Sequence, residues 1–118
     1  MSTAGRPEHA VARLSRAISL RQDDPNLFRE RAEASVLAKD YRMAIINFRK
    51  VISLQESQRE AMEKRLSEVC YKYGTELVAE EKYKEALEMF DDAIGYDPRN
   101  KDISTRRCGF PLIHTLCL

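Results

Sequence analysis

Apolar residues recur at spacings of three and four positions along most of the chain, and that spacing places them on one face of an α-helix. Ala10, Leu14, Ala17 and Ile18 form the first such set, and further sets follow as far as residue 94. The pattern predicts an all-α chain. The small numbers of glycines and prolines, 4 of each, agree with this because β folds need many turn residues.

Capping residues indicate where two of the helices begin. Asp24 followed by Pro25 predicts a helix start, because aspartate is a favoured N-cap and proline fits the first helical position. Asp40 predicts another start, so the preceding helix should end near Lys39.

The second half of the chain predicts two more helices, one from about residue 57 to 81 and one from about 82 to 95. Gly95 is expected to cap the last helix, and Pro98 prevents it from continuing. The side chains expected to face inward in these four helices are Phe28, Ala32, Val36 and Leu37, then Tyr41, Ala44, Ile45, Phe48, Val51 and Ile52, then Met62, Leu66, Val69, Tyr73 and Leu77, and finally Tyr83, Ala86, Leu87, Phe90, Ala93 and Ile94.

Two of the predicted helix pairs repeat each other in sequence. Residues 40–48 read DYRMAIINF, and residues 82–90 read KYKEALEMF. The first helix fits the same pattern. Each of the three helices has a small residue followed four positions later by a larger apolar one: Ala10 and Leu14, Ala44 and Phe48, and Ala86 and Phe90.

This arrangement resembles the tetratricopeptide repeat (TPR), a 34-residue helix-turn-helix unit. The family's later small residue is matched by Ala17, Val51 and Ala93, and its closing proline by Pro98. Small residues stand where two helices cross closely, and aromatic residues fill the space between neighbouring pairs. The resemblance therefore implies antiparallel helix-turn-helix hairpins stacked as a short α-solenoid of the TPR type.

The spacing of the repeats divides the chain. Ala10 and Ala44 are 34 positions apart but Ala44 and Ala86 are 42 apart, so eight residues are inserted as added helical turns. We expect a flexible N-terminus at 1–7, a half repeat at 8–24, a repeat at 25–58, an insertion at 59–66, a repeat at 67–100 and an irregular apolar tail at 101–118. Both terminal faces lack a visible polar cap, so the chain is interpreted as a fragment or short isoform of a longer multi-repeat protein.

Composition bears on location and partners. Lys and Arg total 20 and Asp and Glu total 19, so the net charge is +1, whereas nucleic acids and anionic membranes select a positive excess. No apolar run reaches the roughly 18 residues that span a bilayer, and no signal peptide is recognisable. We expect no nucleic-acid or membrane partner and a cytoplasmic location. The long insertion resembles cilium- and testis-associated family members, which adds the cilium as an alternative.

Residues for catalysis or metal binding do not converge in the sequence. There is no glycine-rich phosphate loop and no nucleophile elbow. His9 and His114 stand near opposite ends, and the three cysteines lack CxxC spacing. Cys70 occupies a position that is aromatic in the family, and we expect a small core residue there. The sequence predicts no enzyme activity, no cofactor and no metal.

In the family that the chain resembles, first helices line a concave groove in which partner peptides or helices dock. The resemblance implies groove-facing positions at Asn26, Arg29, Glu33 and Val36, and at Glu68, Tyr71, Thr75 and Val78. Such a mixed set suits a polar peptide with an apolar anchor. Family members that clamp a chaperone's terminal carboxylate carry asparagine where Glu33 stands, and Glu33 would repel that group.

Two functional hypotheses follow. The first is a non-catalytic interaction module that holds a segment of a partner protein or peptide in the groove. The alternative is a structural fragment that stacks through its uncapped terminal helices onto another repeat array or another copy of itself.

Overall fold

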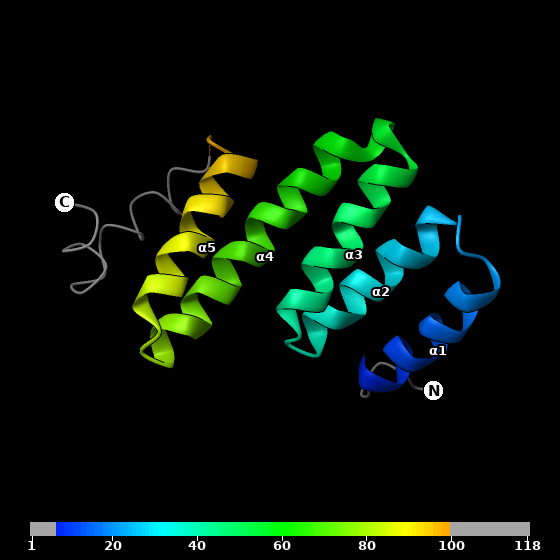
Figure 1. Ribbon diagram of the computed structural model, residues 1–118, viewed down its shortest axis with the longest axis horizontal. Helices are drawn as coiled ribbons and strands as arrows, with labels where there is room; N and C mark the ends of the chain where they lie inside the picture. The colour runs from blue at the N-terminus through cyan, green and yellow to red at the C-terminus, as the bar shows by residue number, and fades with distance from the viewer. Residues whose placement is uncertain (1–6, 100–118) are drawn as a thin grey trace. The chain divides into compact units, whose positions relative to one another are not determined.

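The computed structural model describes residues 7–99, which form five α-helices and one short 3₁₀ turn (Figure 1). The helices are α1 (Pro7–Leu20), α2 (Pro25–Leu37), α3 (Tyr41–Leu54), α4 (Arg59–Ala79) and α5 (Tyr83–Tyr96), and the 3₁₀ turn is Glu56–Gln58. No strand occurs between residues 7 and 99. The all-α prediction is therefore confirmed, as is the long helix before the last one.

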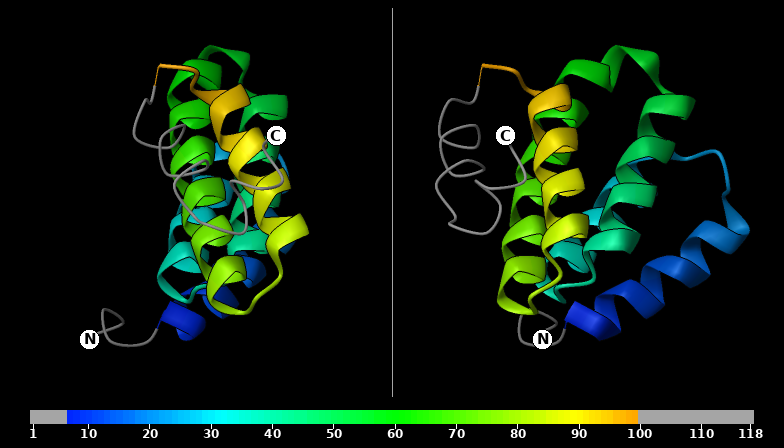
Figure 2. Two further views of the ribbon diagram at one scale, coloured as in Figure 1. Left: turned by 90° about the vertical axis from the view of Figure 1, so that its left-hand side faces the viewer. Right: turned by 60° about the vertical axis from the view of Figure 1, so that its left-hand side comes forward.

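The chain divides into two units, Met1–Met62 and Glu63–Leu118, with the boundary inside α4. The first unit contains α1, α2 and α3, and the second contains most of α4 together with α5. Within the second unit, α4 and α5 run antiparallel and side by side in Figure 1 and in both views of Figure 2. Each unit is thus built around one helical hairpin, α2–α3 or α4–α5.

The turns of the two hairpins have the same backbone geometry. Lys39 has a φ of 62° and Glu81 a φ of 61°, so both turns pass through the left-handed region directly after the helix. The next amide then donates to a carbonyl near the helix end at 2.8 Å, from Asp40 N to Ser35 O and from Lys82 N to Leu77 O. This is the Schellman pattern of hydrogen bonds. The sequence repeat therefore extends to the backbone of the turns.

Both predicted aspartate N-caps are present. The Asp24 carboxylate accepts a hydrogen bond from the Asn26 amide at 3.0 Å, and Pro25 occupies the first position of α2. The Asp40 carboxylate accepts from the Met43 amide at 3.2 Å. These contacts satisfy amides that have no partner inside the helix, which is why aspartate favours this position.

Close helix packing defines the second hairpin. Leu77, Ala86 and Phe90 form its buried cluster, which Tyr73, Met89 and other partly buried side chains surround. A Cβ atom added at Gly74 would lie 2.8 Å from Phe90 Cε1, so only glycine allows α4 to approach this ring so closely. Ser67 Oγ on α4 donates to the Ala93 carbonyl on α5 at 2.7 Å.

Most residues expected to face inward are buried, and the exceptions are instructive. Leu37 is 72% exposed, so its predicted core position is wrong. Gly95 does not cap α5, because the helix continues to Tyr96 and Asp97 follows as the C-cap. Pro7 is the first residue of α1. Cys70 is buried, as expected for a small core residue. Residues 1–6 and the predicted tail at 101–118 lie outside the described residues.

Candidate partner-binding faces

The predicted groove positions of α2 lie on one face but differ in accessibility. Asn26 is exposed, Arg29 and Glu33 are half-buried, and Val36 is only 9% exposed and offers a partner little surface. Arg29 donates from Nη2 to Asn26 Oδ1 at 2.8 Å. The backbone amide of Asn26 donates to the Asp24 cap, so Asn26 lies in the first turn of α2 and its side chain places the guanidinium of Arg29 near the start of the helix.

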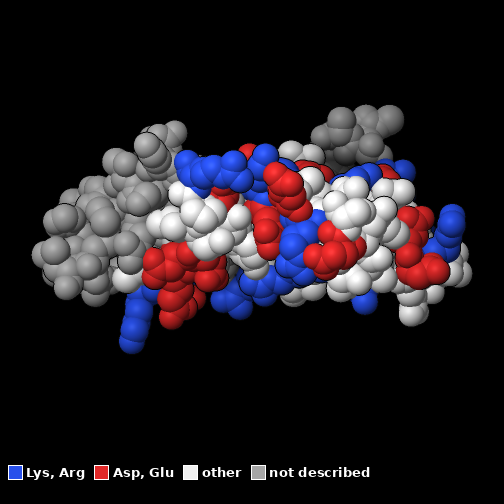
Figure 3. Space-filling view, turned by 90° about the horizontal axis from the view of Figure 1, so that it is seen from above, with Lys and Arg blue, Asp and Glu red and all other residues white. Residues whose placement is uncertain are grey.

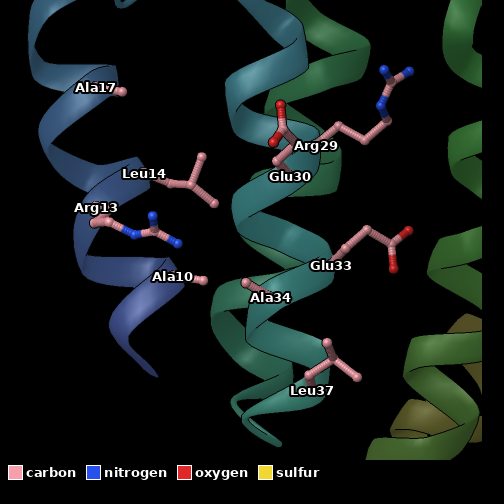
Figure 4. A pocket seen from close by; sticks show the side chains of 9 residues that line it. All are labelled: Ala10, Arg13, Leu14, Ala17, Arg29, Glu30, Glu33, Ala34 and Leu37. Atoms are coloured by element: carbon pink, nitrogen blue, oxygen red, sulfur yellow. The ribbon is translucent and has the colours of Figure 1, made fainter. Parts of the chain in front are cut away.

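Arg29 and Glu33 also line a cleft between α1 and α2 with a volume of about 690 Å³ (Figure 4). The remaining lining residues are Ala10, Arg13, Leu14 and Ala17 from α1 and Glu30, Ala34 and Leu37 from α2. Leu37 is exposed because it borders this cleft, which explains the failed core prediction. The cleft combines an apolar floor with charged side chains of both signs.

The predicted positions on α4 carry internal contacts of their own. Glu68 forms an ion pair with Arg65 one turn earlier. The ring of Tyr71 packs against Phe90, with centroids 5.8 Å apart at a tilt of 44°. Thr75 donates its hydroxyl hydrogen to the Tyr71 carbonyl at 3.0 Å, and Val78 packs against the core of the hairpin. Glu68 and Thr75 are exposed, whereas Tyr71 and Val78 are half-buried and thus serve packing as well as surface.

Sequence reasoning missed an arginine that joins three helices. Arg31 on α2 donates from Nε to Asn47 Oδ1 on α3 at 2.8 Å, and from Nη1 to Ser15 Oγ on α1 at 3.1 Å. Its guanidinium also lies 5.7 Å from the centre of the Phe28 ring, within cation–π range. We call Ser15, Arg31 and Asn47 the polar clip. It fixes how α1 is held against the α2–α3 hairpin.

Burial makes the polar clip energetically important. Asn47 is fully buried, and its side-chain amide donates to the Met43 carbonyl at 2.7 Å while its oxygen accepts from Arg31. Partial burial lowers the pKa of Arg31, although an arginine in protein remains protonated at neutral pH. An asparagine within the apolar face of a predicted helix was the sequence signal, because a buried amide requires partners.

Acidic and basic side chains lie close together over much of the face shown in Figure 3. Among residues 7–99 there is no cluster of three or more His, Cys, Asp or Glu side chains that could hold a metal ion. In the same part of the chain, no helix is both long and apolar enough to cross a membrane.

Comparison with known protein families identifies the repeat. Residues 67–100 match the model of the tetratricopeptide repeat family. Residues 67–100 are therefore a tetratricopeptide repeat. The matched segment covers most of α4 and all of α5, the hairpin in which Gly74 meets Phe90. No curated protein was found to match the chain.

The geometry of the α4–α5 hairpin accounts for the residue types in the matched segment. Gly74 allows the helices to approach, and Ala86, Phe90 and Ala93 are fully buried along α5. Tetratricopeptide repeats generally serve as protein–protein interaction modules. That role draws attention to the accessible side chains of α2 and α4.

Proposed function

We propose that the chain is a non-catalytic interaction module that binds a segment of a partner protein through the exposed positions of its first-type helices, α2 and α4. The observation that carries this proposal is the pairing of Arg29 and Glu33 with apolar side chains at the border of one cleft. Affinity between proteins depends on a few anchors in an apolar setting, with polar groups that set orientation.

The chemistry of these positions restricts the partner segment. Arg29 presents a planar guanidinium, which favours a carboxylate or a carbonyl oxygen. Glu33 lies on the same helix face and repels a second negative charge, so a segment with several adjacent acidic groups is disfavoured. Tyr71 offers a half-buried aromatic ring as an apolar contact. The expected ligand is a mixed polar segment with an apolar anchor.

The test is affinity capture from cell lysate with matched variants as baits. We expect Arg29→Glu and Tyr71→Ala to lose the same captured protein. Lys84→Glu is the charge control because Lys84 is exposed on the second-type helix α5. Tyr83→Ala is the aromatic control because Tyr83 is half-buried and packs on the same cluster as Tyr71. Both controls should keep the partner.

If the Arg29→Glu and Tyr71→Ala baits still capture the same protein as the natural chain, this proposal is contradicted. Equal loss with Tyr83→Ala would show that the hairpin had merely been destabilised, and the Tyr71 result would then give no support. Circular dichroism of each bait separates loss of the fold from loss of a contact.

Assembly through the first helix is a second candidate function, and one observation favours it. Ala10, Leu14 and Ala17 of α1 are half-exposed and line the cleft instead of being covered. Sedimentation at several protein concentrations tests whether copies of the chain associate. A monomer at all concentrations argues against self-association.

A further inference from the structure

Helices α1, α3 and α5 each match the second helix of a repeat, and we call them second-type helices. The face of α1 that lines the cleft is more accessible than the equivalent faces of α3 and α5. Ala10, Leu14 and Ala17 are all half-buried. The equivalent residues of α3 and α5 are at most 1% exposed, and they are Ala44, Phe48, Val51, Ala86, Phe90 and Ala93. The same pattern of small and large apolar residues is thus covered in two copies and accessible in the third.

In the two complete hairpins, the first helix of the repeat covers this apolar face of the second. Helix α2 packs on α3 and buries Ala32 completely, and α4 packs on α5 with Gly74 against Phe90. Each covering helix therefore has a small residue at its centre. Among the helices of residues 7–99, none precedes α1 in the way that α2 precedes α3 and packs on it.

We propose that the cleft between α1 and α2 is a docking site for an amphipathic helix of a partner protein, with a small residue at the centre of its apolar face. The cleft holds about 690 Å³, and its apolar lining comes from both helices. In Figure 4 the side chains of Leu14 and Arg13 extend from α1 towards α2. Leucine at position 14 replaces the phenylalanine of the other copies, so the partner helix has room for a central residue at least as large as Ala32 of α2.

Charge specifies a second feature of the partner helix. By the 34-residue spacing, Arg13 corresponds to Asn47, which accepts a hydrogen bond from Arg31, the residue directly before Ala32. A cation at the corresponding place on α1 calls for an anion on the helix that covers it. The partner helix should therefore carry Asp or Glu directly before its central small residue.

This inference concerns the cleft that also supports the proposed function, because Arg29 and Glu33 line it as well. Its test uses Ala10 and Arg13 of α1, which are not among the groove positions. The probe is a fluorescent peptide of residues 24–39 of this chain, which contains the natural first-type helix α2. A second peptide carries Arg31→Glu. Fluorescence anisotropy measures binding of both peptides to the full chain.

We expect the full chain to bind the Arg31→Glu peptide about threefold more tightly than the natural one, as one exposed charge pair allows. Arg13→Glu in the chain should reverse this preference. Ala10→Glu should abolish binding of both peptides, because it places a charge on the apolar floor of the cleft. Ala12→Glu is the matched control, because Ala12 is exposed on the same helix outside the cleft lining.

Three results would overturn the proposal. The first is no binding of either peptide at millimolar concentration to a chain whose helical circular dichroism is intact. The second is a peptide preference that Arg13→Glu leaves unchanged. The third is concentration-dependent dimerisation that Ala10→Glu removes, because the cleft would then hold a second copy of the chain. If Ala10→Glu loses both peptides but still captures the partner protein from lysate, the cleft and the proposed groove bind their ligands separately.

Discussion

The two hairpins share a backbone plan but are held together by different chemistry. Their turns have matching positive φ values at Lys39 and Glu81 and matching hydrogen bonds across the helix ends. Between α2 and α3, the guanidinium of Arg31 bonds to the buried Asn47. At the equivalent positions of the second hairpin stand Tyr73 and Met89, both packed on an apolar cluster. The same two positions of the repeat can therefore hold either two polar side chains or two largely apolar ones.

The difference follows from what each hairpin must hold. Arg31 also reaches Ser15, so the polar pair of the first unit fixes a third helix as well as its own hairpin. Hydrogen bonds are directional and set the orientation of α1, whereas apolar contacts mainly add stability. In the second hairpin, stability comes from the close approach of Gly74 to Phe90 and the hydrogen bond between Ser67 and Ala93.

The largest expected effect comes from breaking the polar clip. Asn47→Ala should lower the free energy of unfolding by about 2 kcal/mol, because it removes the acceptor of a partly buried cation. Urea unfolding followed by circular dichroism measures the loss. Asn26→Ala is the matched control: it also removes an arginine's acceptor, but at an exposed site, and should cost less than about 0.5 kcal/mol.

A double-variant cycle sharpens this test. In an Arg31→Ala background, Asn47→Ala should cost much less, because the buried donor is already gone. Additive losses would show that the two side chains do not depend on each other, and the contrast between the hairpins would then be one of composition alone.

The next largest effect concerns the α4–α5 hairpin, where replacing each of two glycines with alanine should change the free energy of unfolding in opposite directions. Gly74→Ala should destabilise the chain by about 1–2 kcal/mol, because the new Cβ would overlap the buried ring of Phe90. Gly95→Ala should stabilise it by up to about 1 kcal/mol, because no atom lies within 4 Å of the new Cβ and alanine favours the helix. Thermal or urea unfolding of the two variants checks the signs, and stabilisation by Gly74→Ala would refute the close-packing argument.

The smallest expected effect comes from exchanging the helix caps. Asp40 caps α3 with its side chain, whereas Lys82 at the equivalent position gives α5 no side-chain hydrogen bond. Lys82→Asp should therefore stabilise the chain by about 1 kcal/mol, and Asp40→Lys should destabilise it by a similar amount. The exposed ion pair between Lys82 and Glu80 contributes little to this balance.

Lys82→Ala is the control for the cap exchange, because it removes the lysine charge without supplying an acceptor. It should give none of the gain of Lys82→Asp in the same unfolding measurement. Equal gains from both changes would mean that the lysine charge, and not the missing cap, weakens the start of α5.

Local signals predicted the helices well and the candidate site only in part. Asp24 and Asp40 marked helix starts because N-capping depends on a few neighbouring residues. Gly95 was misassigned as a cap because the pattern does not report φ, and glycine is also tolerated inside a helix. Leu37 was misassigned to the core because periodicity identifies an apolar face but not what covers it.

The sequence by itself determined the five helices, their pairing into hairpins and the tetratricopeptide repeat, because these depend on periodicity and short-range spacing. The tertiary structure alone showed that Arg31 joins Ser15 and Asn47 across three helices, and that Ala10 and Leu14 line a cleft. Both hydrogen bonds of Arg31 join residues 16 positions apart, on different helices. The apolar period of a helix shows which of its faces is buried but not which other helix packs against that face.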